Sequence, residues 1–271
     1  MAPSRITTTF EALRRDGRVA LVPYVTAGDP DLDTTLAVLV ALADGGADVI
    51  ELGVPFSDPM ADGPVIEAAM VRALAGGTTL ARVLDLARRF RATHATPLVL
   101  FGYLNPLLRA GLADVCRRAA DAGVDGFLVV DLPPEEAAQL TDHSRAAGLD
   151  FIALFTPTSD DARVSAIARH ASGFAYYVSM AGVTGDKLSD LEAVAARVGA
   201  IRADTGLPVC VGFGIRTPDD AARVARFADG VVIGTGLVQA IHDAGPARAA
   251  EVAGELARRF RAAIDASRAG A

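Results

Sequence analysis

Short apolar runs rich in β-branched residues alternate with amphipathic segments along the whole chain. The runs predict buried strands that start near Val19, Asp48, Pro97, Gly126, Phe151, Phe174, Pro208 and Val231. Between them, apolar residues recur at helical spacing, as in the segment from Leu80 to Ala87 that follows Gly76-Gly77. Strands that alternate with helices form parallel sheets with helical crossovers, and about eight such units predict a (β/α)8 barrel.

Two further features refine this α/β TIM-barrel prediction. A helical pattern over residues 4–15 precedes the first strand, and we expect this extra N-terminal helix to close the bottom of the barrel. The longest interval between strand starts, from Asp48 to Pro97, indicates an extended loop after the second strand. The alternative fold is an open doubly wound sheet. It needs a glycine-rich dinucleotide turn after the first strand, and residues 26–30 do not form one.

Composition limits the classes of function. With 51% apolar residues and no low-complexity linker, residues 1–271 are expected to form a single domain. The net charge of -7, without a dominant arginine cluster, argues against a nucleic-acid partner. The longest apolar run, Leu36 to Ala43, is too short to span a membrane, and residues 1–10 lack a signal-peptide core. We therefore expect a cytoplasmic location.

Cys116 and Cys210 share no metal-site spacing and are expected to be inert buried thiols.

The segment from Asp48 to Pro64 carries the first candidate chemistry. It begins as an apolar, strand-like run, but an ionisable Glu51 lies inside that run, and the loop behind it holds Asp58 and Asp62. A carboxylate at the end of a buried strand costs several kcal/mol unless it has partners or stays protonated. Such shifted groups often serve catalysis, although a paired structural acid is the alternative interpretation of Glu51 taken alone.

Glycine-bearing turns follow the last three predicted strands, at residues 182–185, 212–215 and 234–236. Glycine lets backbone N–H groups approach a ligand, and loops after strands seven and eight are the usual phosphate site of this barrel. Thr217 is predicted to begin a helix whose first turn carries Asp219 and Asp220, which would repel a phosphate. We therefore expect the anion at Gly214 and at the helix start near Gly234. The alternative is that these glycines only turn the chain.

The available side chains narrow the reaction. A Schiff-base aldolase needs a lysine inside the barrel, but the only lysine, Lys187, lies in a glycine-flanked loop. A metal-dependent aldolase needs clustered histidine ligands, and none of the 4 histidines follows a predicted strand, so no metal is expected. What remains is general acid–base catalysis by Glu51 and Asp62 on a small phosphate ester.

Four segments, in order over essentially the whole chain, resemble the tryptophan synthase alpha subunit family. They are PYVTAGDP at 23–30, ELGVPFSDPMADGP at 51–64, SMAGVTG at 179–185 and GFGI at 212–215, of which the second is highly specific. The resemblance implies a carbon–carbon lyase that cleaves indole-3-glycerol phosphate to indole and glyceraldehyde 3-phosphate, with no cofactor. It implies that Glu51 protonates indole C3 and takes the proton of the glycerol hydroxyl next to the ring. Asp62 would accept a hydrogen bond from the indole N–H.

The resemblance also implies the remaining substrate contacts, including a tyrosine near Glu51 and an apolar indole slot. The substrate-binding residues expected are Tyr24, Ile66, Phe101, Leu128, Leu154, Tyr176, Thr184, Gly185, Phe213, Gly214, Gly234 and Thr235. The loop at 181–188 is a candidate lid, in which Thr184 would close onto Asp62. Three positions depart from the family pattern: Met180 replaces a frequent Arg, Tyr24 a frequent Phe, and Thr235 a common Ser.

Family members dock a beta subunit on the rim around this site, which implies an α2β2 complex that passes indole onward for L-tryptophan synthesis. The rim residues expected to contact that partner are Phe56, Asp58, Pro59, Asn105 and Pro133. Another phosphate-binding barrel, such as an epimerase or indole-glycerol-phosphate synthase, is an alternative. The synthase requires catalytic lysines at strand ends, which this chain lacks. A regulatory subunit without turnover is the alternative from another class, and the presence of both carboxylates argues against it.

Overall fold

The computed structural model of the chain describes residues 3–178, 191–212 and 214–268. Among these residues, nine parallel strands form one sheet in the order β5-β4-β3-β2-β1-β9-β8-β7-β6. The strands are β1 (Ala20–Thr26), β2 (Ile50–Gly53), β3 (Leu98–Gly102), β4 (Gly126–Val129), β5 (Asp150–Phe151), β6 (Ala153–Phe155), β7 (Ala175–Val178), β8 (Val209–Gly212) and β9 (Gly230–Ile233). The predicted parallel barrel is confirmed, with each predicted strand start within two residues of an observed one.

The fifth barrel strand is split into β5 and β6, which is why nine strands replace the expected eight. β5 pairs with β4, and β6 pairs with β7. Only Ile152 separates the two segments, and its N–H donates to the carbonyl of Phe127 in β4 at 2.8 Å. The chain therefore passes from one neighbour to the other at this point, and the two edges of the sheet meet there.

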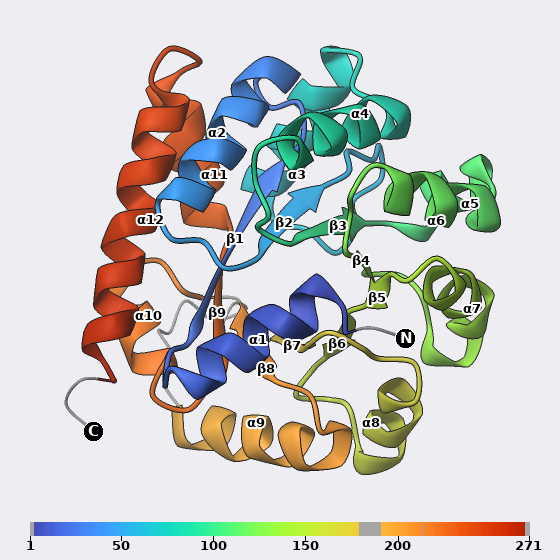
Figure 1. Cartoon of the computed structure of the whole chain (residues 1–271), viewed down its shortest axis with the longest axis vertical. Helices are drawn as coiled ribbons and strands as arrows, with labels where there is room; N and C mark the ends of the chain where they lie inside the picture. The colour runs from blue at the N-terminus through green and yellow to red at the C-terminus, as the bar shows by residue number, and fades with distance from the viewer. Residues whose placement is uncertain (1–2, 179–190, 213, 269–271) are drawn as a thin grey trace.

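The helices surround the strands, as Figure 1 shows. They are α1 (Arg5–Arg15), α2 (Leu32–Asp44), α3 (Pro64–Ala75), α4 (Leu80–Arg91), α5 (Leu104–Ala110), α6 (Leu112–Asp121), η1 (Pro134–Glu136), α7 (Ala138–Ala146), α8 (Asp161–Ala168), α9 (Leu191–Thr205), α10 (Pro218–Val224), α11 (Thr235–Ala244) and α12 (Ala249–Ala266). Outward-facing strand residues pack against these helices in the largest apolar cluster, to which Leu21, Leu52 and Leu100 belong. None of the helices within the described residues is long and apolar enough to cross a membrane.

Helix α1 covers the N-terminal end of the barrel. Its N-cap is Ser4, whose hydroxyl accepts a hydrogen bond from the N–H of Thr7 at 3.1 Å. Its buried residues, Ile6, Phe10 and Leu13, belong to the same cluster as the inward-facing strand residues. In Figure 1 this helix lies in front of the strands. The barrel interior is therefore filled from below by α1 and is a packed core at that end.

Alternation along the strands decides which side chains point into the barrel. Successive strand residues face opposite sides, so residues two apart share a face. Val49 belongs to the interior cluster, whereas Ile50 and Leu52 belong to the outer one. Glu51 follows Val49 by two residues and therefore points inward at the C-terminal end of β2. Its position is set by the strand and by the pleat of the sheet.

The long interval between the second and third barrel strands holds an extra helix as well as a loop. The loop covers residues 54–63, and α3 then begins with Pro64, a residue favoured in the first turn of a helix. The expectation that the extra length is an extended loop is therefore correct only in part. Ile66 and Met70 of α3 are buried and pack with Tyr24 in a third apolar cluster, so α3 forms one wall at the mouth of the barrel.

Candidate active site

A cavity of about 200 Å³ lies at the C-terminal ends of the strands. Its walls come from five strands and from the loops that follow them. The lining residues are Tyr24, Glu51, Asp62, Gly63, Ile66, Phe101, Tyr176, Gly214, Ile215, Arg216, Val232, Gly234 and Thr235. This set brings together both predicted carboxylates, three of the predicted apolar or aromatic slot residues, the predicted tyrosine of β7 and four residues of the predicted phosphate turns.

Glu51 is fully buried at the inner end of this cavity. Neither of its carboxyl oxygens has a hydrogen-bond partner among the described residues. Burial without a compensating donor disfavours the charged form and raises the pKa of Glu51 to about 8. At neutral pH the side chain is therefore a protonated acid, and it can donate a proton to a bound molecule.

Two tyrosines lie near Glu51, and each depends on a glycine for space. A Cβ atom at Gly53 would collide with the hydroxyl of Tyr24, and a Cβ at Gly212 would collide with the hydroxyl of Tyr176. Burial, reinforced by nearby acids, raises the pKa of both phenols, so both stay neutral. Among the described residues, no cation pairs with Glu51 to stabilise its ionised form. This arrangement explains why the effect of burial on Glu51 is not offset.

Asp62 has a different environment. It lies in the loop between β2 and α3, is half-buried, and accepts a hydrogen bond from the hydroxyl of Tyr103 to its Oδ2 atom at 2.7 Å. Burial raises the pKa of Asp62, while the hydrogen bond from Tyr103 acts in the opposite direction. The cavity therefore holds one carboxyl without a donor and one with a donor, an arrangement that separates an acid from an anion.

The opposite side of the cavity is built from backbone. Gly214 has a φ of 76°, a conformation that favours glycine. Gly234 is the N-cap of α11 and provides no side-chain cap, and both Gly234 and Thr235 line the cavity, so this helix start can offer backbone N–H groups to a ligand there. Such a helix start binds anions through N–H donors and the helix dipole.

The neighbouring helix start, that of α10, is closed to an anion. Thr217 is its N-cap, as predicted, and forms a capping box with Asp220. The carboxylate of Asp220 accepts the N–H groups of Arg216 at 3.2 Å and Thr217 at 3.1 Å. These donors are already used by the protein's own carboxylate, which supports placing the anion at α11 instead.

Some predicted contacts lie elsewhere. Leu128 and Leu154 belong to the barrel interior cluster but are not among the residues that line the cavity, so their contact with a ligand stays a prediction. Thr184, Gly185 and Phe213 lie outside the described residues, as do Met180 and the proposed lid at 181–188.

Several residues of the site were missed by the sequence analysis: two that line the cavity and one that contacts Asp62. Arg216 brings a guanidinium group to the phosphate side, where only neutral donors had been expected. Val232 faces the cavity two residues before Gly234, so strand alternation could have identified it. Tyr103 donates a hydrogen bond to Asp62. It follows the third predicted strand among residues that turn chemistry also explains, and no local sequence pattern identifies it.

The predicted partner residues all follow neighbouring strands. Phe56, Asp58 and Pro59 lie in the loop after β2, Asn105 in α5 after β3, and Pro133 in the loop after β4. Asp58, Asn105 and Pro133 are exposed, and Phe56 and Pro59 are partly exposed. Two further apolar side chains of these segments are exposed, Met60 at 88% and Leu108 at 47%. The rim beside the cavity therefore presents apolar surface to solvent, as an interface does.

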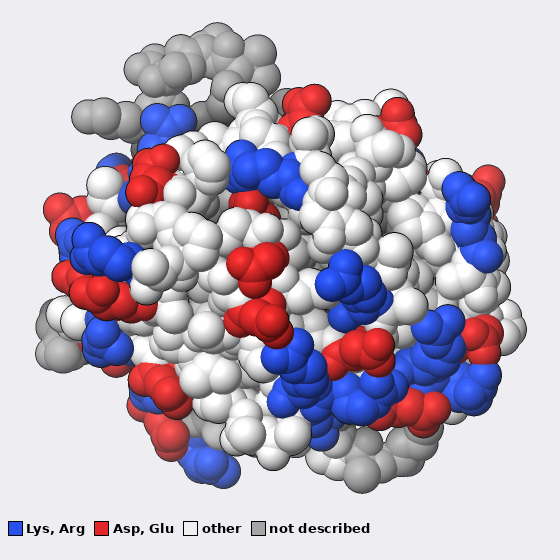
Figure 2. Space-filling view, turned by 90° about the horizontal axis from the view of Figure 1, so that it is seen from above, with Lys and Arg blue, Asp and Glu red and all other residues white. Residues whose placement is uncertain are grey.

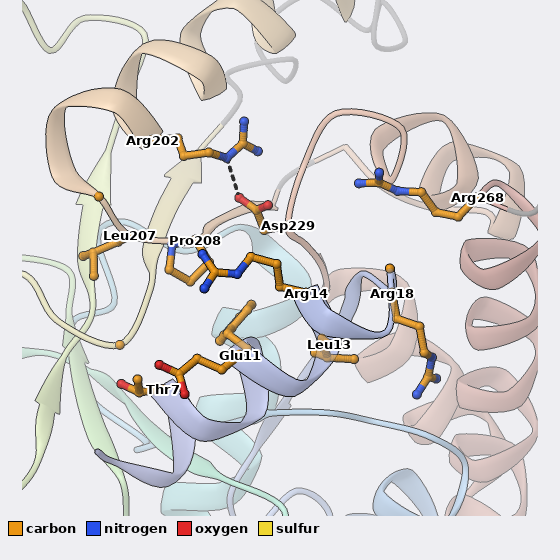
Figure 3. Close-up of a pocket in the computed structure, with 14 residues that line it drawn as sticks. Thr7, Glu11, Leu13, Arg14, Arg18, Arg202, Leu207, Pro208, Asp229 and Arg268 are labelled. Carbon is orange, nitrogen blue, oxygen red and sulfur yellow. Dashed lines mark hydrogen bonds and ion pairs between the residues drawn. The ribbon is translucent and has the colours of Figure 1, made fainter. Parts of the chain in front are cut away.

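A second cavity, of about 420 Å³, lies at the opposite end of the barrel between α1, the turn before β8 and the end of α12, and is drawn in Figure 3. It contains none of the predicted site residues. Its charged side chains include Arg202 and Asp229, which pair at 2.8 Å. In barrels of this kind the N-terminal end serves stability, and the pairing here fits that role.

The charged side chains and the possible metal ligands are two further features of the molecule. On the face drawn in Figure 2, acidic and basic side chains are intermingled. The described residues contain no group of three or more His, Cys, Asp or Glu side chains placed to hold a metal ion.

Similarity to known proteins agrees with this site. A family model described as "Tryptophan synthase alpha chain" matches residues 10–265. The tryptophan synthase alpha chain of Phenylobacterium zucineum is 57% identical over 245 residues, which cover 90% of this chain and 88% of that protein. The alpha chain of Burkholderia pseudomallei is 55% identical, with 97% of each chain covered. The crystal structure of tryptophan synthase subunit alpha from Legionella pneumophila superposes with a TM-score of 0.91 at 43% identity, covering 98% of this chain and 100% of that one.

Proposed function

Because the chain belongs to the tryptophan synthase alpha chain family, we propose that the cavity at the strand ends is where it cleaves indole-3-glycerol phosphate. The family reaction, which this enzyme carries out, yields indole and glyceraldehyde 3-phosphate. The observation that carries the assignment of the site is the unpartnered, buried Glu51 in the same cavity as Asp62 and the uncapped start of α11.

Glu51 acts as both acid and base. Protonated at neutral pH, it transfers its proton to C3 of the indole ring, which makes the ring an electron sink. The resulting carboxylate then takes the proton of the hydroxyl on the adjacent glycerol carbon. The bond between C3 and that carbon breaks, its electrons return to the ring, and the glycerol carbon becomes the aldehyde of glyceraldehyde 3-phosphate. Glu51 ends the cycle protonated, so no cofactor is needed.

Asp62 stabilises the charge that this step creates. Protonation at C3 leaves a positive charge on the ring nitrogen. An ionised carboxylate that accepts a hydrogen bond from this N–H stabilises the charged state. The apolar side chains of Ile66 and Phe101 and the ring of Tyr24 would hold the flat indole between the two carboxyl groups. The roles of the two acids differ because only Asp62 has a hydrogen-bond donor among the described residues.

The phosphate group would lie at the far side of the cavity. Gly214 and the N-terminus of α11 supply neutral N–H donors, and Arg216 supplies the one guanidinium among the described lining residues. This places the dianionic end of the substrate away from Glu51. Such separation matters, because a dianion beside Glu51 would raise its pKa further and oppose the transfer of its proton to C3.

The enzyme works with a beta subunit, and the rim of loops after β2, β3 and β4 is the proposed docking surface, in an α2β2 complex. Its exposed apolar residues lie next to the cavity from which indole must leave. We also propose that the chain forms one domain and acts in the cytoplasm, where an enzyme of amino-acid biosynthesis meets its substrate.

An indole-release assay with and without the beta subunit tests this function. Wild-type protein should release indole, and Glu51→Gln should lose that turnover while still binding glyceraldehyde 3-phosphate. A chain that only regulates its partner would release no indole in either form but would raise the activity of the beta subunit, and that result would replace the proposal.

A further inference from the structure

The side chain of Tyr103 links two consecutive residues of the loop that carries Asp62. Its hydroxyl donates to Oδ2 of Asp62 at 2.7 Å and accepts the backbone N–H of Ala61 at 3.0 Å. Tyr103 itself follows β3 as the N-cap residue of α5. One phenol from the β3 loop therefore fixes both the backbone and the carboxylate of the β2 loop.

Packing leaves the Tyr103 ring little freedom. The residue is 2% exposed, and its ring lies 5.2 Å from that of Phe56 with an interplanar angle of 32°. It belongs to the apolar cluster that also contains Ile66 and Met70 of α3. The next residue, Leu104, donates its N–H to Asp131 at 2.7 Å, which fixes the backbone beside the ring. A donor on a fixed ring imposes its direction on the group that it binds.

Asp62 needs such a partner because it lies on a loop. Residues 54–63 form neither helix nor strand, and the N–H of Asp62 bonds only within the loop, to the carbonyl of Pro59 at 3.0 Å. Among the described residues, Tyr103 is the one side chain recorded as hydrogen-bonded to the Asp62 carboxylate. A carboxylate on an unsupported loop samples several rotamers. Rotamers that point away from the substrate weaken the contact that the carboxylate makes in the transition state.

We propose that Tyr103 is a positioning residue for the reaction: it holds Oδ2 of Asp62 so that Oδ1 faces the indole N–H. This inference rests on the role proposed for Asp62. Since a carboxylate has two oxygens, the hydrogen bond satisfies one and leaves the other for the substrate. Tyr103 does not touch the reacting atoms and does not line the cavity.

The same hydrogen bond favours the ionised form of Asp62. Burial raises the pKa of Asp62, and Tyr103 lowers it. The other titratable or charged groups around this cavity are Glu51, Tyr24 and Tyr176 on the strands and Arg216 beyond β8, and Asp131 lies beside Tyr103. The phenols stay neutral, and Glu51 is protonated near neutral pH. Loss of the Tyr103 hydroxyl should therefore raise the pH at which Asp62 becomes ionised.

The test compares Tyr103→Phe with Tyr177→Phe in the complex with the beta subunit. Each change removes one hydroxyl and keeps the ring, but Tyr177 faces outward from β7 into the outer apolar cluster. Because hydrogen bonds to charged groups are among the stronger ones, Tyr103→Phe should lower kcat about tenfold, with KM changed by less than about twofold. The acidic limb of its kcat/KM profile should move to higher pH. Tyr177→Phe should leave kcat and the pH profile as in the wild type.

A double-mutant cycle with Asp62→Asn separates the possible failures. If Tyr103 acts through Asp62, adding Tyr103→Phe to Asp62→Asn should cost almost nothing further. An equal loss in both backgrounds, or an unchanged kcat and pH profile for Tyr103→Phe, would overturn the inference. If Asp62→Asn itself retained full turnover, the proposed role of Asp62 would fail first. Circular dichroism melting of each variant ensures that kcat refers to folded protein.

Discussion

Carboxyl groups lie at both ends of the barrel, and Glu51 has a different environment from three aspartates at the N-terminal end. These three aspartates each accept an N–H from the start of a neighbouring strand and pair with arginine: Asp48 with Leu21 and Arg261, Asp125 with Leu98, Arg91 and Arg5, and Asp229 with Val209 and Arg202. At the C-terminal end, Glu51 has neither a donor nor a cation among the described residues.

The difference indicates what each end does. Burial raises the pKa of Asp125, but a strand N–H and two arginines oppose that effect, so its charge is used to join strands. Glu51 shows the uncorrected effect of burial, a pKa of about 8. An unsatisfied buried carboxyl costs stability and is retained where chemistry requires it. One end of the barrel is therefore built for stability and the other for reaction.

The largest expected effect comes from removing the acid. Glu51→Gln should lower turnover by about 10³-fold or more, because the amide cannot supply a proton to C3 or take one back. The free energy of unfolding should not fall in parallel. Steady-state indole release, measured beside a urea unfolding curve, checks both. Retained turnover would remove Glu51 from the mechanism.

A substitution at the N-terminal end of the barrel should lower stability and leave turnover nearly unchanged. Asp125→Ala leaves Arg91 and Arg5 without their shared partner and the N–H of Leu98 without its acceptor. Breaking such a partly buried network should lower the free energy of unfolding by about 3–5 kcal/mol. The folded fraction should keep near-wild-type kcat. Loss of kcat without loss of stability would mean that the two ends are not separate in function.

The burial of Glu51 should make the free energy of unfolding depend on pH. The folded protein keeps this group protonated to about pH 8, whereas the unfolded chain releases the proton above its ordinary pKa of 4.5. The unfolded state therefore binds fewer protons between these values, and the free energy of unfolding should fall by about 3 kcal/mol from pH 5 to pH 8. Glu51→Met should abolish this contribution and be more stable than wild type at pH 8. Parallel pH profiles for the two proteins would contradict it.

The smallest effect is expected at the phosphate side. Arg216 lies at the mouth and is exposed, so its attraction for a phosphate is screened by water and salt. Arg216→Ala should raise KM about threefold to tenfold with kcat nearly unchanged. Arg223→Ala is the control, since Arg223 is on α10 and does not line the cavity. Equal KM values for Arg216→Ala and Arg223→Ala would show that neutral N–H donors alone account for phosphate binding.

Local patterns predicted the barrel and the inward position of Glu51, because strand alternation and an acid inside an apolar run are both features of neighbouring residues. The split of the fifth strand at Ile152 has no such signal. The pairing of Asp48 with Arg261 joins residues 213 positions apart, so the sequence could not tell this satisfied acid from Glu51, three residues later. Tyr103 was missed for the same reason: its role depends on a loop from another strand.

The protonation state of Glu51 is the most direct test of the account. Difference infrared spectra of wild-type protein against Glu51→Gln, recorded from pH 5 to pH 10, report the carbonyl stretch of one buried, protonated carboxyl. The account predicts that this band is present at pH 7 and disappears with a midpoint of about pH 8. A side chain already ionised at pH 7, with a midpoint near its ordinary value of 4.5, would contradict it.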